Sequence, residues 1–239
     1  MSAPDDLRRA LSVVDLTRLE RPDEAAAIDA LAAKAVTPAG SVAAICVYPE
    51  WIERVIGTGV PVAAVANFPA GEDDADLAAR EAAGAVEVGA AEVDVVVPWR
   101  AFAAGNDEAI ERVVAATRRA IGDGTGLKAI LETGSLGGAD AVRRAGEQAL
   151  GAGADFLKTS TGKVGPGASL EATRVLLEVV RDAGRGAVKA SGGIRTAEQA
   201  AGYLALADEV MGPGWATPER FRIGASSLVD DLLARLAAA

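Results

Sequence analysis

Residues 154–163 read Ala-Asp-Phe-Leu-Lys-Thr-Ser-Thr-Gly-Lys. The apolar run at the start predicts a buried strand that ends at Lys158, and the Thr/Ser/Gly residues after it predict a turn that leads to Lys163. Burial disfavours the charged form of a lysine, and the neutral amine that it favours is a nucleophile. The stretch therefore predicts a strand whose end presents a reactive lysine; a structural ion pair is the alternative for Lys158.

The beginning of this stretch belongs to a pattern that recurs along the chain. A helix ends in a Gly/Ala turn, and an acidic residue and an apolar strand follow. The pattern is clear in GAGADFLK (151–158) and in GAAEVDVVV (89–97), and it is weaker in ALADEVMG (205–212). It indicates short buried strands that alternate with helices.

Eight apolar runs are predicted as strands, and each is followed by a helical run. The expected strands are residues 11–16, 42–48, 60–67, 93–97, 127–131, 155–158, 187–190 and 220–224. The expected helices are residues 22–36, 49–56, 73–88, 106–121, 139–150, 169–183, 196–206 and 226–236, with a short leading helix at 5–10. Near-continuous apolar strands indicate a parallel sheet covered on both faces. Eight such units predict an α/β fold, a (β/α)8 TIM barrel formed by residues 1–239 as a single domain. An open doubly wound sheet is the alternative.

The composition limits the classes of binding partner and the cellular compartment that we expect. Half of the residues are hydrophobic and only 4% are aromatic, which predicts a large aliphatic core. The formal net charge of −10 argues against a nucleic-acid binder, whose surface is basic, but leaves room for a small anion bound by local lysines. The sequence shows neither a signal segment nor a membrane-spanning stretch, and it has a single cysteine, Cys46. These features predict a cytoplasmic protein without membrane contacts.

The distribution of ionisable residues narrows the chemistry. The chain has no histidine, which excludes Ser-His-Asp and Cys-His nucleophile systems and histidine metal sites. Only five of the 24 basic residues are lysines, and four of these lie in or beside strand-like segments: Lys128, Lys158, Lys163 and Lys189. Lysine can lose its proton and form an imine, whereas arginine cannot. The Arg-rich composition explains why lysines are scarce, but not where they lie.

Several polar residues interrupt the apolar strands, and most lie near a predicted carboxyl end, where barrel enzymes carry their chemistry. They are Asp15, Cys46, Asn67, Asp94, Lys128, Lys158 and Lys189. Asp94 and Lys128 lie further back, so we expect them to pair inside the barrel, because neither could stay charged alone. Structural roles stay open as well. Asp94 could serve only to pair with Lys128, Asp15 could cap a loop, Cys46 could be a small buried hydrophobe, and Asn67 could be a turn residue.

Glycine and hydroxyl residues follow the last three predicted strands. They are Thr161-Gly162-Lys163, Ser191-Gly192-Gly193 and Gly224-Ala225-Ser226-Ser227. The loops after strands seven and eight of this fold, with a helix N-terminus, commonly bind phosphate. One such turn would be weak evidence, but three on adjacent strands predict a phosphate site.

Stretches that match one family run nearly from end to end of the chain. They are DLT from Asp15, CVYP from Cys46, VANFP around Asn67, EVDVVVPWRAF around Asp94, LKAILETG around Lys128, ADFLKTSTGK around Lys158, VKASGGIRT around Lys189, and FRIGASSL at 221–228. The sequence therefore resembles the deoxyribose-phosphate aldolases, the class I aldolases of 2-deoxyribose 5-phosphate. ADFLKTSTGK is the most specific of these stretches.

The resemblance implies a role for each site residue. Lys158 would form the Schiff base, with Lys189 and Asp94 as its catalytic partners. The implied substrate contacts are Asp15, Thr17, Cys46, Asn67, Lys128 and Thr161. The implied phosphate contacts are Gly162, Lys163, Gly192, Gly193, Gly224, Ser226 and Ser227.

The implied reaction is the reversible cleavage of 2-deoxy-D-ribose 5-phosphate to D-glyceraldehyde 3-phosphate and acetaldehyde, in deoxyribose phosphate catabolism. We expect no cofactor and no metal, because the imine on Lys158 acts as the electron sink. Family analogy further implies a homodimer or homotetramer.

One departure from the family pattern concerns the carboxyl end. Some members end in a tail whose C-terminal tyrosine is implicated in proton transfer. This chain ends in LARLAAA and its last tyrosine is Tyr203, so we expect barrel residues to move the protons.

Two other functions stay open. One is a different lysine-dependent barrel aldolase, such as a transaldolase-like enzyme, and the other is a non-catalytic phosphate-binding barrel.

Overall fold

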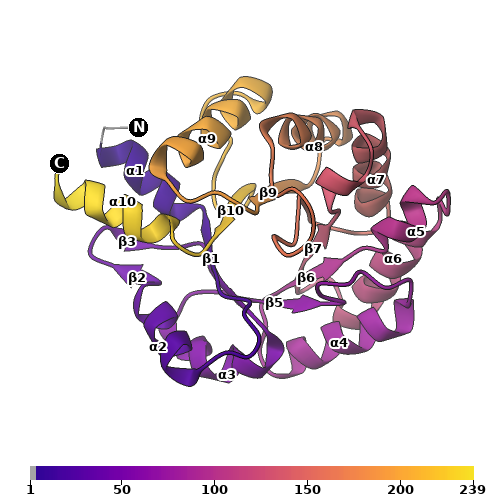
Figure 1. Ribbon diagram of the computed structural model, residues 1–239, viewed down its shortest axis with the longest axis horizontal. Coiled ribbons are helices and arrows are strands. Elements are labelled where there is room, and N and C mark those ends of the chain that lie inside the picture. Colours follow the sequence, from indigo (N-terminus) through magenta and orange to yellow (C-terminus); the bar gives the residue numbers. More distant parts are fainter. Residues whose placement is uncertain (1–3) are drawn as a thin grey trace.

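The structure of the protein, a computed structural model, describes residues 4–239. Eight parallel strands close into a barrel in the order β1-β10-β9-β8-β7-β6-β5-β4, and helices surround it (Figure 1). The barrel strands are β1 (Val14–Thr17), β4 (Ala44–Val47), β5 (Val62–Ala66), β6 (Glu92–Val96), β7 (Gly126–Ile130), β8 (Phe156–Lys158), β9 (Ala187–Ser191) and β10 (Phe221–Ala225). The closed barrel confirms the predicted (β/α)8 fold and rules out the open sheet.

The helices follow the strands as the sequence pattern predicts. They are α1 (Pro4–Ser12), α2 (Ala25–Ala33), α3 (Ile52–Val55), α4 (Ala75–Glu87), α5 (Trp99–Ala103), α6 (Ala109–Ile121), α7 (Ala139–Gly151), α8 (Leu170–Ala183), α9 (Ala197–Met211) and α10 (Leu228–Ala237). Ser169 caps α8 by accepting a hydrogen bond from the backbone N–H of Ala172, as expected of a serine at that position. Within residues 4–239, no helix combines the length and the apolar character needed to cross a membrane.

The leading helix α1 packs against the last two helices of the chain, α9 and α10, so the first and last helices lie side by side (Figure 1). Leu7 and Leu11 are its buried residues of large volume. Arg9 donates hydrogen bonds of 2.7 and 2.6 Å to the two carboxylate oxygens of Asp208 on α9. The predicted short helix at 5–10 is therefore an integral part of the outer layer.

Side chains alternate across every strand, and this alternation separates two layers. The outward residues of β6 and β7, for example Val93 and Leu127, pack against the helices in the main apolar core. The inward residues of the same strands include Asp94 and Lys128, which are also fully buried. The helices therefore stabilise the barrel from outside through an aliphatic layer. Inside the barrel, the inward positions of β6 and β7 carry charge, whereas those of β4 and β5 contribute Cys46, Ala63 and Val65 to a second apolar cluster.

Some predicted boundaries are wrong. The helix expected at 22–36 covers only Ala25–Ala33, because the chain then forms an antiparallel pair of strands, β2 (Val36–Thr37) and β3 (Gly40–Ser41). The helix expected at 49–56 is divided into a 3-10 turn at Pro49–Trp51, the short α3 and a second 3-10 turn at Ile56–Thr58. Short helical segments between loops carry too little periodicity to be resolved from sequence.

Two further differences concern helices. α5 (Trp99–Ala103), which follows Pro98, was not predicted, because the proline indicates only that a strand stops there. The weaker strand pattern at 205–212 is wrong, because α9 continues to Met211. Asp208, which resembles a residue at the start of a strand, instead pairs with Arg9 across the helix interface.

A substitution tests the outer apolar layer. Phe221 at the start of β10 has 0% of its surface exposed and belongs to this core. We expect Phe221→Ala to lower the free energy of unfolding by about 3–5 kcal/mol, because apolar burial is lost and a cavity remains. Leu170→Ala, at a position that is 50% exposed, should change it by less than about 0.5 kcal/mol. Urea denaturation measures both, and equal losses would contradict this account of the core.

Candidate active site

Strand register brings charged residues together inside the barrel. Asp94 on β6 is the register partner of Lys128 on β7, and Lys158 on β8 is the partner of Lys189 on β9. Lys189 is in turn paired with Arg222 on β10. Partners in a parallel sheet present their side chains to the same face, which here is the barrel interior. Residues that are far apart in the sequence therefore become one cluster.

The carboxylate of Asp94 is the centre of this cluster. Its Oδ2 accepts hydrogen bonds of 2.7 Å from the Nζ atoms of both Lys158 and Lys189, and its Oδ1 accepts one of 2.9 Å from Lys128. Burial by itself would raise the pKa of Asp94, but the three ammonium groups lower it well below its ordinary value. Asp94 is therefore an ionised carboxylate shared by three lysines.

Lys158 and Lys189 differ in their protonation although they lie next to each other. Burial lowers the pKa of Lys189, but Asp15, whose Oδ2 lies 2.5 Å from Nζ, and Asp94 raise it well above its ordinary value. The pKa of Lys158 is lowered, chiefly by burial and further by the charge of Lys189, against the opposing effect of Asp94. Lys189 is thus held as an ammonium ion, while Lys158 is biased toward the neutral amine.

The charge count of the barrel interior agrees with one neutral base, and the lowered pKa indicates which base it is. The barrel interior contains three acids and four bases: Asp15, Glu92, Asp94, Lys128, Lys158, Lys189 and Arg222. An unbalanced charge in a buried cluster is strongly unfavourable. The interior is neutral when one base has lost its proton, and Lys158 is the base of the cluster whose pKa is lowered.

The lower part of the cluster contains two residues that the sequence analysis missed. Arg222 bridges Asp15 and Glu92, with N–O distances of 2.7 and 3.0 Å, and Lys128 also contacts Glu92. Arg222 lies on a predicted strand and Glu92 lies directly before one, and a charge at an inward position of a strand was the signal that could have found them. In the described part of the chain, no group of three or more His, Cys, Asp or Glu side chains has an arrangement that could hold a metal ion.

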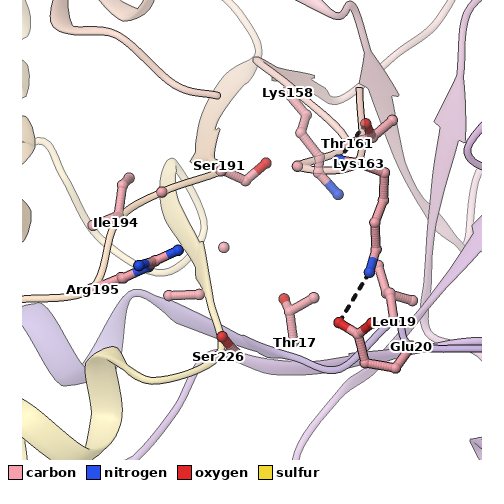
Figure 2. A pocket seen from close by; sticks show the side chains of 15 residues that line it. Thr17, Leu19, Glu20, Lys158, Thr161, Lys163, Ser191, Ile194, Arg195 and Ser226 are labelled. Carbon is pink, nitrogen blue, oxygen red and sulfur yellow. Dashed lines mark hydrogen bonds and ion pairs between the residues drawn. The ribbon is translucent and has the colours of Figure 1, made fainter. Parts of the chain in front are cut away.

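A cavity of about 260 Å³ opens above Lys158, whose Nζ points into it (Figure 2). Its walls contain predicted site residues from the carboxyl ends of β1 and β10 and from the loops after β8, β9 and β10: Thr17, Thr161, Gly162, Lys163, Gly192, Gly193, Gly224 and Ser226. Ser191 and Ala225, from the predicted turns, also line the cavity, together with four residues that the sequence analysis did not single out: Leu19, Glu20, Ile194 and Arg195. The three glycine-rich turns therefore do meet in space.

The loops around the cavity hold each other through polar bonds and close backbone contact. Ser191 receives a hydrogen bond at its carbonyl from Thr159 Oγ1, and its own hydroxyl donates to the carbonyl of Ser160 at 2.7 Å. Gly167 lies so close to Gly192 that a Cβ at Gly167 would be 2.3 Å from the Gly192 oxygen. Glycine is required there because the loops after β8 and β9 touch through their backbones.

Glu132 supports the loop that follows Lys158. It follows β7 with a φ of 54°, in the left-handed region that side chains disfavour. Its Oε2 accepts hydrogen bonds from the backbone N–H (3.2 Å) and the hydroxyl (2.8 Å) of Thr161. Burial raises the pKa of Glu132, against the effect of these two hydrogen bonds. Its place in Glu-Thr-Gly, directly after a predicted strand, was the available signal.

Five predicted substrate or phosphate residues do not line the cavity. Asp15 and Lys128 lie in the charged cluster beneath it. Cys46 is buried with its Sγ 3.9 Å from Asp94 Oδ2, and burial raises the pKa of its thiol. The amide of Asn67 bonds to the backbone of Glu72 and Val96, as a turn residue does. Ser227 is the N-cap position of α10 and lies just beyond the wall.

The fold and this constellation define a class of protein. In the (β/α)8 enzymes, the site lies at the carboxyl ends of the strands, and the phosphate-binding loops follow the last strands. The cavity and the buried lysine cluster occupy those positions here. The chain belongs to the DeoC/LacD family of aldolases, whose family model matches residues 9–230, and it is an aldolase.

Solved structures agree with this placement. The deoxyribose phosphate aldolase of Aeropyrum pernix, described as having a unique tetrameric structure, is 27% identical, with a TM-score of 0.80 over 100% of this chain and 94% of that one. A protein from Coccidioides immitis that is provisionally assigned as a deoxyribose-phosphate aldolase is 31% identical, with a TM-score of 0.82 over 94% and 85%. One from Toxoplasma gondii, with the same provisional assignment, is 23% identical, with a TM-score of 0.90 over 98% and 95%, a likeness that concerns the fold.

The charge of Lys189 provides a test of the site electrostatics. Because that charge lowers the pKa of Lys158, Lys189→Leu should raise it. Only the neutral amine attacks a carbonyl, so the limb along which imine formation rises with pH should move to higher pH. Borohydride trapping of the imine across a pH series measures this without requiring turnover.

Lys34→Leu is the matched control, since Lys34 lies on the surface and pairs with Asp230. It should leave the limb in place. A limb that stays in place in Lys189→Leu as well would contradict the repulsion between the two lysines.

Proposed function

We propose that the protein is a class I aldolase that cleaves 2-deoxy-D-ribose 5-phosphate reversibly to D-glyceraldehyde 3-phosphate and acetaldehyde. The observation that carries the proposal is the position of Lys158. A buried lysine with a lowered pKa stands at one end of a cavity whose other walls are glycine-rich turns, Lys163 and Arg195. A nucleophilic amine and an anion-binding wall in one cavity fit an aldehyde with a phosphate at its far end.

The reaction follows from the chemistry of the amine. Nζ of Lys158 adds to the C1 aldehyde of the open-chain sugar, and loss of water gives an imine. In its protonated form the imine accepts the electron pair of the C2–C3 bond as this bond breaks. The C3 hydroxyl loses its proton and becomes the aldehyde of glyceraldehyde 3-phosphate. The enamine left on Lys158 is protonated at C2, and hydrolysis releases acetaldehyde and restores the amine.

Asp94 and Lys189 are proposed to move protons beside Nζ of Lys158. Asp94 Oδ2 is 2.7 Å from Nζ of both Lys158 and Lys189, so it can take the proton that the attacking amine loses and exchange it with Lys189. Lys189 then supplies a proton to the departing hydroxyl of the carbinolamine. Asp15, 2.5 Å from Lys189, keeps that lysine charged between cycles. Lys128 has the role of a charge partner to Asp94.

The predicted residues in and beside the cavity wall are proposed to bind the substrate. Thr17 and Thr161 line the cavity between Lys158 and the glycine-rich turns, which suits the two sugar hydroxyls. The phosphate would be held by Gly162, Lys163, Gly192, Gly193, Gly224 and Ser226 of the lining, with Arg195 as an additional cation and Ser227, at the N-cap of α10, just beyond the wall. Backbone N–H groups freed by glycine and the N-terminus of α10 favour an anion there. Cys46 and Asn67 are proposed only to shape the surroundings.

Wider aspects of the function are also proposals. The reaction needs no cofactor or metal, because the imine is the electron sink. We place the protein in the cytoplasm, in deoxyribose phosphate catabolism, as a single-domain enzyme. A single buried cysteine fits a reducing compartment. A homo-oligomer is proposed by analogy with the tetrameric Aeropyrum pernix aldolase.

Trapping and mutation test the reaction together. Borohydride reduction in the presence of acetaldehyde should leave an N-ethyl group on Lys158, located by peptide mass spectrometry. Lys158→Arg should lose both the adduct and the cleavage of 2-deoxyribose 5-phosphate, because arginine cannot form an imine. Lys34→Arg, which changes a surface lysine in the same way, should retain both.

Two results would contradict the proposal. One is cleavage of the sugar phosphate by Lys158→Arg at the wild-type rate, and the other is an adduct confined to another lysine. An adduct on Lys158 together with no cleavage of 2-deoxyribose 5-phosphate would assign the imine to a different lysine-dependent aldolase reaction.

A further inference from the structure

One carboxylate stands in the wall of the cavity that is otherwise lined by cations and neutral groups. Among the described residues of the lining, Lys158, Lys163 and Arg195 are basic and Glu20 is the acid. Oε1 of Glu20 lies 3.0 Å from Nζ of Lys163 (Figure 2). The two residues are 143 positions apart in the sequence and come from the loops after β1 and β8. The lysine proposed to bind phosphate therefore already has an anionic partner.

The loop that carries Glu20 is held on both sides. Arg18 binds both carboxylate oxygens of Asp23 at 2.7 to 2.9 Å, and the side chain of Asp23 is only 2% exposed. Arg21 pairs with Glu50 at 2.9 Å, and its guanidinium lies 3.9 Å from the centre of the Tyr48 ring. The neighbouring charges of this loop are thus engaged elsewhere, and Glu20 is left facing Lys163. Its position follows from the fold of the loop.

The contact between Glu20 and Lys163 is one that a phosphate can displace. The side chain of Glu20 is 62% exposed and that of Lys163 is 30% exposed. Ion pairs between exposed groups are weak because water screens them. A phosphate dianion that reaches Lys163 competes with the carboxylate for its ammonium group and meets the repulsion of that carboxylate at short range. An uncharged ligand in the same cavity meets neither obstacle.

We infer that Glu20 is a specificity-determining residue. By holding Lys163 it competes with the phosphate of the substrate. It therefore reduces the degree to which the site prefers phosphorylated over unphosphorylated 2-deoxy sugars. The inference rests on the proposed aldolase function. In this account, the carboxylate of Glu20 lowers the affinity of the cavity wall for the phosphate dianion below the affinity that Lys163 and Arg195 alone would give.

The substitution that tests this is Glu20→Gln, which keeps the shape and removes the charge. We expect KM for 2-deoxyribose 5-phosphate to fall about 3- to 10-fold, while kcat changes far less and KM for unphosphorylated 2-deoxyribose stays the same. The gain should shrink as ionic strength rises, because salt screens exposed charges. An unchanged KM for the phosphorylated sugar, or an equal fall for both sugars, would overturn the inference.

A matched control separates a local effect from a change in net charge. Glu209 pairs with Arg174 at 2.9 Å and is 63% exposed, nearly the values of Glu20, but it lies on α9, outside the cavity lining. Glu209→Gln should leave both KM values unchanged. In a Lys163→Met background, Glu20→Gln should change KM for the sugar phosphate by less than about 2-fold, because the competition is for Lys163. A full effect in that background, or an equal effect of Glu209→Gln, would overturn the competition.

Titration with inorganic phosphate separates failure of the inference from failure of the proposed function. Calorimetry of the unliganded protein should show phosphate binding that is about 3- to 10-fold tighter in Glu20→Gln than in the wild type. Equal affinities would overturn the inference whatever the enzyme cleaves. Lack of cleavage of 2-deoxyribose 5-phosphate by the wild type would instead count against the proposed function.

Discussion

The structure depends on one carboxylate that is shared by three lysines. Asp94 is fully buried, and it stays ionised because Lys128, Lys158 and Lys189 surround it at 2.7 to 2.9 Å. Removing one partner of such a cluster leaves an uncompensated buried charge, which is strongly destabilising. The same carboxylate therefore stabilises the barrel interior and sets the protonation of the lysines next to it.

Because charged residues occupy much of the barrel interior, apolar burial between the strands and the helices must stabilise the fold. Barrels of this fold usually fill their interior with branched aliphatic side chains. Here inward positions of β6, β7, β9 and β10 carry Asp94, Lys128, Lys189 and Arg222, while outward residues such as Val93 and Val188 form the apolar core with the helices. This division lets one lysine lose its proton while the outer layer keeps the strands in place. An interior with three acids and four bases is neutral when Lys158 is an amine.

The loops around the cavity determine which groups face the amine of Lys158. Glu132 holds the loop after β8 through Thr161, and the backbones of Gly167 and Gly192 touch, so the anion-binding turns are fixed relative to Lys158. Glu20, from the loop after β1, contributes to the wall as well and pairs with Lys163. Lys158 ends β8 and Lys163 lies in the loop directly after it, so the nucleophile and part of the phosphate wall belong to one strand and its loop.

The sequence by itself determined the alternation of eight strands and helices and the positions of the unusual lysines, because periodicity and composition are local properties. Lys158, Lys189 and Asp94 could be selected since a charged residue in an apolar strand is visible without any partner. Tertiary structure alone decided which charges meet: Arg222 with Asp15, Lys128 with Glu92, and Glu20 with Lys163. These pairs join residues 36 to 207 positions apart, and strand register and barrel closure, which no local pattern encodes, bring them within contact distance.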